Sequence, residues 1–205
     1  MSLFADDLAA DLPSLVPGDA PFLLCGLSMG GYVSFEFLRR HGTRLRSRLR
    51  ALVLCDTKAA ADDDATRAKR REAIEAIRKN GIDSAFVAMA PRLLSPTSKG
   101  TPAETLIREM ILGTPPATAV ADLAGLALRS DAFDVLGAFD RPVLVVCGED
   151  DAITPAADAE AMAAACPNAP FVRLFTVPDA GHMAPLEQPG EVAAAIAELI
   201  SRLPA

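Results

Sequence analysis

The pentad Gly-Leu-Ser-Met-Gly at positions 26–30 is the feature that most restricts how this chain can fold. It directly follows an apolar run at 22–25 and leads into a stretch with helical apolar spacing at 32–40. A serine in the context of strand, sharp turn and helix is the arrangement that exposes a nucleophilic hydroxyl at the end of a buried strand. The turn crowds the backbone two residues on either side of the serine, where only glycine is expected to fit. We therefore expect a strand that ends in a tight turn at Ser28.

Four short apolar runs, each bounded by turn residues, are predicted to be strands. They occupy residues 22–25, 51–55, 143–147 and 171–177. Continuous apolar runs of this length are typical of parallel strands that are buried on both faces. Helical stretches alternate with them at 32–40, 155–165 and 189–202. This alternation predicts an α/β fold with a mostly parallel sheet and flanking helices.

The long segment between the second and third apolar runs contains no convincing strand. Its spacing predicts four helices, at 64–80, 83–94, 102–112 and 117–129, with Gly81 as the cap that ends the first of them. We interpret residues 57–140 as a helical cap insertion. The core is then made of residues 1–56 and 141–205.

A serine hydroxyl becomes a good nucleophile only when a base removes its proton, and histidine is the usual base near neutral pH. The chain has two histidines, His41 and His182. His41 follows Ser28 by thirteen residues, or about 20 Å along an unbroken helix, so it cannot reach the hydroxyl and is expected near the helix end. His182 follows the run at 171–177, and the carboxyl ends of parallel strands lie at one edge of a sheet. His182 is therefore the candidate base.

The base needs a carboxylate that holds its tautomer and stabilises its charge. Asp56 follows the run at 51–55, and Asp150 and Asp151 follow the run at 143–147. Either strand gives the order serine, acid, histidine along the chain. Position alone leaves the choice open.

Taken together, these motifs resemble the α/β-hydrolase superfamily, in its serine esterase and enol-lactonase branch, from residue 22 to the C-terminus. Residues 26–31 resemble its nucleophile elbow, residues 148–151 with Pro155 its acid loop, and residues 181–182 with Leu186, Glu187 and Pro189 its histidine loop. The family's Gly-x-x-Asp spacing implies Asp151 as the acid. Asp56 is the reserve, because some members place the acid one strand earlier. The helical insertion resembles the family's cap, which shapes the substrate pocket.

The resemblance implies a serine hydrolase that cleaves a small carboxylic ester or lactone through an acyl-enzyme on Ser28. Asp151 and His182 complete the triad, and the backbone N–H of Met29 is one donor of the oxyanion hole. Carbon–carbon bond hydrolysis and cofactor-free perhydrolysis use the same triad and stay open as alternatives. No cofactor or metal is expected, since the sequence has neither a P-loop nor a G-x-G-x-x-G motif.

The main departure from the family is the short segment before Ser28, which has 27 residues and one predicted helix at 3–12. In the family several strands precede the elbow, and a loop after one of them supplies the second oxyanion donor. We therefore expect the N-terminal part of the sheet to be missing, and an inactive truncated hydrolase is a further alternative. The strand at 22–25 is then an apolar edge that could pair with a second copy or exchange strands.

Charge and composition narrow the range of partners. The chain carries 27 acidic and 20 basic side chains, for a net charge of −7, which argues against nucleic acid as a partner. The arginines between positions 39 and 50 have no interleaved aromatic residues and are expected to be solvated. No apolar run reaches the 18 residues of a membrane helix, and acids stand where a secretory signal carries basic residues, so we expect a cytoplasmic protein. Cys25, Cys55 and Cys147 lie near strand ends and are predicted to pack in the core rather than to bind metal.

Overall fold

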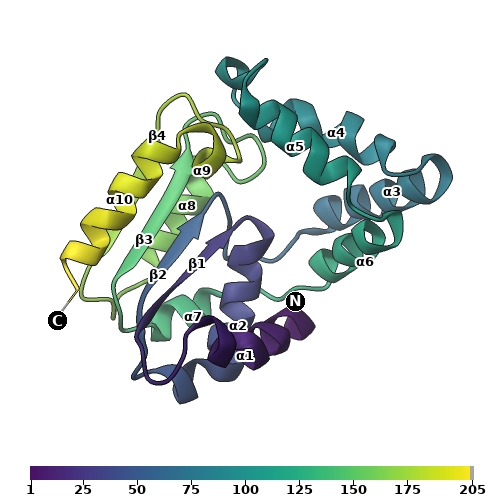
Figure 1. The fold of residues 1–205 in the computed structure, drawn as a ribbon. Coiled ribbons are helices and arrows are strands. Elements are labelled where there is room, and N and C mark those ends of the chain that lie inside the picture. The colour runs from purple at the N-terminus through teal and green to yellow at the C-terminus, as the bar shows by residue number, and fades with distance from the viewer. Residues whose placement is uncertain (204–205) are drawn as a thin grey trace.

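The computed structural model describes residues 1–203, which form a parallel sheet with helices on both faces (Figure 1). Its strands are β1 (Phe22–Leu27), β2 (Leu49–Cys55), β3 (Val143–Gly148) and β4 (Val172–Val177). They lie in the order β1-β2-β3-β4, and each pairs parallel with the next. The predicted α/β fold with a parallel sheet is confirmed.

Burial differs between the middle and the edges of the sheet. Nearly every residue of β2 and all of β3 are buried, as the continuous apolar runs predict. The prediction that 171–177 is buried on both faces is wrong, because β4 is an edge strand whose Leu174 is 36% exposed. At the other edge, Cys25 of β1 is also exposed, so the prediction that Cys25 packs in the core is wrong, whereas Cys55 and Cys147 are buried. Pairing of β1 with a second copy stays a prediction.

The helices cover the two faces of the sheet unequally. Helices α2 (Met29–Leu45), α7 (Phe133–Ala138) and α8 (Ala156–Ala164) cover one face, with α1 (Ser2–Leu15) packed against α2. Helices α9 (Ala184–Glu187) and α10 (Pro189–Ser201) cover the other face. Each Leu, Phe or Val that is buried in these layers contributes about 1.5–3 kcal/mol of transfer free energy. The two apolar layers hold the strand ends, and thus the loops that follow them, in place.

Most of the helices between β2 and β3 lie to one side of the sheet (Figure 1). They are α3 (Asp64–Asn80), α4 (Asp83–Leu93), the 3-10 turn η1 (Pro96–Ser98), α5 (Pro102–Leu112) and α6 (Pro116–Ala127). The four predicted helices are thus present with small shifts at their ends, and Gly81, at φ 77°, ends α3 as expected. We call residues 64–127 the cap segment. The division of the chain into core and cap stays a prediction, and α7, inside the predicted insertion, packs with the core.

Within residues 1–203, no single helix combines the length and the apolar composition that a bilayer crossing requires. Helices α5 and α6 satisfy both requirements only as a pair, and they are bent by 96° relative to each other.

Candidate active site

Ser28 occupies a strained turn between β1 and α2. Its φ of 50° and ψ of −111° lie in a region that L-residues rarely adopt. Two hydrogen bonds hold the turn to β2 and to the loop after it: Ser28 N donates to Cys55 O at 2.9 Å, and Thr57 Oγ1 donates to Ser28 O at 2.8 Å. These two hydrogen bonds hold Ser28 in its strained conformation, at the sharp turn that the motif predicts.

The glycines around this turn are required unequally. A Cβ on Gly26 would lie 2.5 Å from Gly30 O, so the predicted need for glycine there is confirmed. A Cβ on Gly30 would meet nothing within 4 Å, so the same prediction is wrong at that position. The crowded position on the helix side is Gly31, where a Cβ would lie 2.4 Å from Thr57 Oγ1. The requirement for glycine therefore falls on Gly31 instead of Gly30, because Thr57 approaches Gly31 closely. No sequence pattern indicates this approach.

His182 connects Ser28 to Asp151. Its Nε2 lies 2.7 Å from Ser28 Oγ, and its Nδ1 lies 2.9 and 3.0 Å from the two carboxylate oxygens of Asp151. Both His182 and Asp151 are buried. The loops after β1, β3 and β4 thus bring the three predicted residues into one hydrogen-bonded chain at the carboxyl edge of the sheet.

Asp151 is held by further donors from its own loop. The backbone N–H groups of Ile153 and Thr154 donate to Oδ1 at 2.8 and 2.9 Å, and Thr154 Oγ1 donates to Oδ2 at 2.8 Å. Burial alone would raise the pKa of Asp151, but the hydrogen bond to His182, the imidazole charge and these N–H groups hold that pKa below its ordinary value. Asp151 is therefore ionised and oriented toward His182. Thr154 is a residue of this site that the sequence analysis missed.

The two other candidate acids have different partners. Asp56 accepts backbone N–H bonds from Gly148 at 2.9 Å and from Ala184 at 3.0 Å, so its oxygens face the backbone of β3 and α9. Burial raises the pKa of Asp56 to about 8, although the Gly148 N–H lowers it. Asp150 accepts a hydrogen bond from Ser95 Oγ at 2.6 Å. Within the described residues, only Asp151 of the three acids bonds to His182.

Asp56, Cys147 and Asp151 have side-chain atoms of the kind that bind metals, and these atoms lie within 4.8 Å of one another. The carboxylates already accept the hydrogen bonds described above. Cys147 packs in the apolar layer, and burial raises the pKa of its thiol to about 12, so it is not a thiolate near neutral pH. Hydrogen bonding and packing therefore account for these three side chains.

Met29 is the first residue of α2. The N–H groups of the first helical turn have no acceptor within the helix, and the helix dipole adds a partial positive charge at this end. The backbone N–H directly after Ser28 is thus of the kind that favours a developing negative charge. It is the position at which the sequence predicts an oxyanion donor.

Glu187 joins the histidine loop to the cap segment. Its Oε1 accepts from Gly181 N at 2.8 Å, and its Oε2 accepts from Ser95 N and Ser98 Oγ, each at 2.7 Å. Ser95 Oγ in turn bonds to Asp150 of the acid loop. The sequence analysis places Glu187 in the histidine loop through the family resemblance but gives it no role. Its contacts with Ser95 and Ser98 are not indicated by that resemblance.

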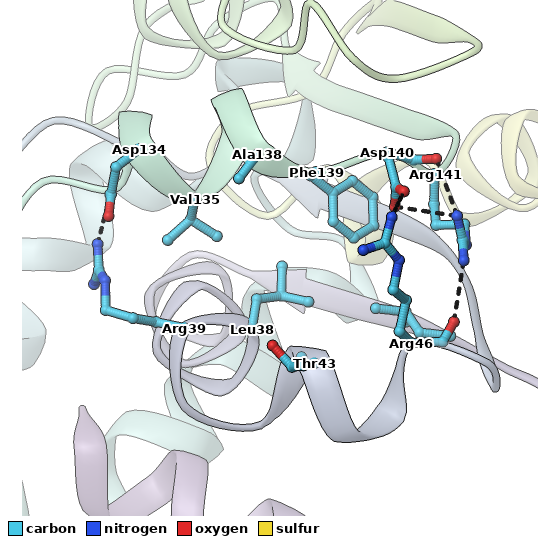
Figure 2. Close-up of a pocket in the computed structure, with 12 residues that line it drawn as sticks. Leu38, Arg39, Thr43, Arg46, Asp134, Val135, Ala138, Phe139, Asp140 and Arg141 are labelled. Atoms are coloured by element: carbon cyan, nitrogen blue, oxygen red, sulfur yellow. Dashed lines mark hydrogen bonds and ion pairs between the residues drawn. The ribbon is translucent and has the colours of Figure 1, made fainter.

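The remaining predicted polar groups lie away from the triad. His41 is inside α2, where its Nε2 lies 2.8 Å from Asp6 Oδ1 of α1. Two of the clustered arginines, Arg39 and Arg46, border a cavity of about 340 Å³ between the C-terminal half of α2 and α7, together with Arg141 (Figure 2). There Arg39 pairs with Asp134, and both Arg46 and Arg141 pair with Asp140.

Comparison with known proteins gives consistent relatives. A family model described as "Alpha/beta hydrolase family" matches residues 2–195. A pimeloyl-acyl-carrier-protein methyl ester esterase of Chromobacterium violaceum is 29% identical over 198 residues, which cover 95% of this chain and 73% of that protein.

Solved structures of hydrolases also match this chain. A thermophilic esterase from Thermogutta terrifontis, determined with malate bound, matches with a TM-score of 0.84 and 40% identity over 97% of this chain and 71% of that one. An enol-lactonase from Burkholderia xenovorans matches with a TM-score of 0.81 and 21% identity over 97% and 72% of the two chains, a likeness of fold alone.

Proposed function

The chain belongs to the alpha/beta hydrolase family, and from this premise we propose that it is a serine esterase that cleaves a small carboxylic ester or lactone through an acyl-enzyme on Ser28. The observation that carries the proposal is the hydrogen-bonded chain from Ser28 Oγ through His182 to Asp151. The order and spacing of these groups are those of a nucleophile, a base and the group that orients the base.

In the first half of the proposed reaction, Ser28 Oγ attacks the carbonyl carbon of the ester while His182 Nε2 takes its proton. The Nδ1–H of His182 donates to Asp151, which holds the tautomer with Nε2 free and stabilises the imidazolium that forms. The carbonyl oxygen becomes an oxyanion next to the N–H of Met29. His182 then returns the proton to the alcohol oxygen as the carbon–oxygen bond breaks, which leaves an acyl group on Ser28.

In the second half, water takes the place of the alcohol. His182 accepts a proton from the water as the water attacks the acyl carbon, and it passes a proton to Ser28 Oγ as the acyl–serine bond breaks. The products are a carboxylic acid and the free enzyme. For a lactone, the acid and the alcohol stay in one molecule.

The relatives support an ester as the substrate class. The Chromobacterium protein is named as a methyl ester esterase and the Thermogutta protein as an esterase. The triad geometry is also compatible with the lactone that the sequence analysis considered. We place the enzyme in the cytoplasm and assign it a mechanism that uses its own side chains, its backbone and water.

Labelling with a fluorophosphonate probe tests the proposal, because the probe reacts with a serine whose hydroxyl has been activated by a base. We expect labelling of the intact chain at Ser28 and loss of labelling in Ser28→Ala and His182→Ala. Ser34→Ala, a substitution of a buried serine in α2, is the matched control and should label normally. A well-folded chain that does not label contradicts the proposal and favours an inactive hydrolase fragment.

A further inference from the structure

A second cavity, of about 290 Å³, lies between the cap segment and the acid loop. Thr154 lines it, and the hydroxyl of this residue bonds to Asp151 and lies 3.3 Å from His182 Nδ1. Tyr32, four residues after Ser28 on α2, lines it as well. The volume is near the lower limit of about 300 Å³ for small-molecule pockets. The cavity therefore provides room for a small group that is separated from Asp151 and His182 by Thr154.

The charges around this cavity are of one sign. Four of the residues that line it carry a positive charge, and none of the residues found to line it carries a negative one. The four are Lys58, Lys69, Arg70 and Arg92. The chain as a whole has a net charge of −7, so the positive charge is a local property of this cavity.

Carboxylates behind the cavity wall compensate only part of this charge. Asp62 is fully buried and pairs with Arg70, with Arg129 at 2.9 Å and, more distantly, with Lys58 at 3.9 Å. One carboxylate thus faces three cations. Asp158 on α8 lies near Lys58, and Asp63 lies near both Lys58 and Lys69, so these carboxylates offset part of the lysine charge.

The cavity at the other end of α2 is an internal comparison. Its three arginines, described above, each pair with an aspartate, and Asp134 and Asp140 themselves line that cavity (Figure 2). At that cavity, the positive charge of the arginines is offset by aspartates in the cavity wall. Positive charge in excess of the lining acids occurs at the cavity lined by Thr154, the residue that bonds to Asp151.

We propose, on the basis of the esterase function proposed above, that this cavity binds a carboxylate carried by the substrate. The preferred substrates are then short esters or lactones with a free carboxylate, such as monoesters of short dicarboxylic acids. Small apolar side chains line the space between the cations, and they leave room for a few methylene groups. These are Ala73, Ala76, Ala85 and Ala88. Lysine and arginine in a partly dry cavity form charge-assisted hydrogen bonds with a carboxylate.

Kinetics with a matched pair of substrates test this assignment. We expect kcat/KM for the mono-p-nitrophenyl ester of glutaric acid to exceed that for p-nitrophenyl valerate, which has the same chain length without the charge, by about tenfold, mainly through KM. The preference should shrink in 0.5 M NaCl, because salt screens the exposed Lys69 and, to a smaller extent, Lys58, whose side chain is 19% exposed. An intact enzyme that hydrolyses the neutral ester equally well or faster overturns the assignment and leaves the esterase proposal standing.

Substitution of both lysines tests whether the preference for the anionic ester arises at this cavity. In Lys58→Gln/Lys69→Gln, Asp62 keeps Arg70 and Arg129, so we expect the chain to fold. The double variant should reduce the ratio of kcat/KM for the anionic ester to kcat/KM for the neutral ester by about fivefold or more. Lys79→Gln, at an exposed position on α3, is the control and should change neither. Equal losses on both esters contradict a carboxylate site.

Binding without turnover separates the two proposals. We expect millimolar glutarate to raise the Tm of the intact chain and of Ser28→Ala alike, and the double lysine variant to lose this shift. A chain that fails to label with the fluorophosphonate probe but keeps the glutarate shift contradicts the esterase proposal alone. A chain that labels but shows no glutarate shift contradicts the carboxylate site alone.

Discussion

The two sides of the candidate site are held in different ways. On the sheet side, Asp56, Asp151 and His182 are buried, and both oxygens of each carboxylate have backbone or side-chain partners. On the cap side, α3 buries only Ile74 and Ile77, and α6 buries none of its described side chains. We infer that the sheet places the reacting groups, whereas the cap segment, attached through a few contacts, places the part of the substrate that is recognised.

The sharpest test of this contrast compares two buried acids. Asp151→Asn should lower kcat by about 10³-fold or more, because an amide no longer stabilises the imidazolium and favours the wrong tautomer of His182. Asp56→Asn should lower kcat by less than about tenfold and destabilise the fold by about 1–3 kcal/mol, because one backbone N–H loses its acceptor. Ester hydrolysis and urea unfolding measure both. The reverse pattern would restore Asp56 as the acid.

The rigidity of the serine turn is tested by two glycines. Gly26→Ala should reduce the free energy of unfolding by about 3 kcal/mol, since its Cβ would meet the backbone of Gly30 at 2.5 Å. Gly30→Ala should change it by less than about 1 kcal/mol, since that Cβ enters open space in the first turn of a helix. Equal unfolding free energies for the two variants in urea would show that the turn shifts to accommodate the Cβ added at position 26.

The pH dependence of stability follows from Asp56. Its pKa is raised to about 8 in the native state, so the unfolded chain releases between pH 4 and pH 8 a proton that the native chain keeps. The free energy of unfolding should therefore fall as pH rises through this range, by at most about 1.4 kcal/mol per pH unit from this group. Urea unfolding at pH 5, 6, 7 and 8 should show a shallower slope in Asp56→Asn. An unchanged slope would assign the dependence to other groups.

The attachment of the cap segment is tested at Glu187. In Glu187→Gln one acceptor oxygen becomes a donor, so the backbone N–H of either Ser95 or Gly181 loses its acceptor, whereas the Ser98 hydroxyl can accept instead of donate. We expect kcat/KM to fall about tenfold and hydrogen exchange to accelerate between residues 93 and 107. Glu191→Gln, at an exposed site in α10, should match the unchanged chain. Accelerated exchange at Ile153 and Thr154 instead would contradict the contrast between the two sides.

The smallest effect is expected on the cap surface. Val87 of α4 is 71% exposed, so Val87→Ser should change the free energy of unfolding by less than about 0.5 kcal/mol. Val146→Ser, in the fully buried β3, should cost about 3 kcal/mol or more. Thermal unfolding of the two variants measures the difference. A large loss at Val87 would show that this surface is covered in solution.

Much of the fold could be predicted from local patterns. The strands β1, β2 and β3 are apolar runs bounded by turn residues, and α3 and α5 have the predicted bounds because a capping residue or a proline marks their ends. Helix α7 was missed, since six residues carry too little periodicity. The half-exposed face of β4 was also missed, because a run of apolar residues does not say which strand is at an edge.

The candidate site, like the fold, could be predicted only in part from local patterns. The positions of Ser28 and His182 follow from spacing, because each comes directly after a strand or its loop. The choice of Asp151 over Asp56 required the family resemblance, since both acids end neighbouring strands. The contacts of Thr57 with Gly31, and of Glu187 with Ser95, join segments far apart in the chain. No local pattern reports such contacts.

The hydrogen bonds of Ser95 have a practical consequence for engineering. Its backbone N–H and its hydroxyl reach Glu187 and Asp150, so one short stretch before η1 connects to both the histidine loop and the acid loop. A chimera that takes its cap segment from a relative can replace α3 to α6 freely only if it keeps this junction. Residues 95–98 are therefore the boundary to preserve when substrate preference is transplanted between members of this family.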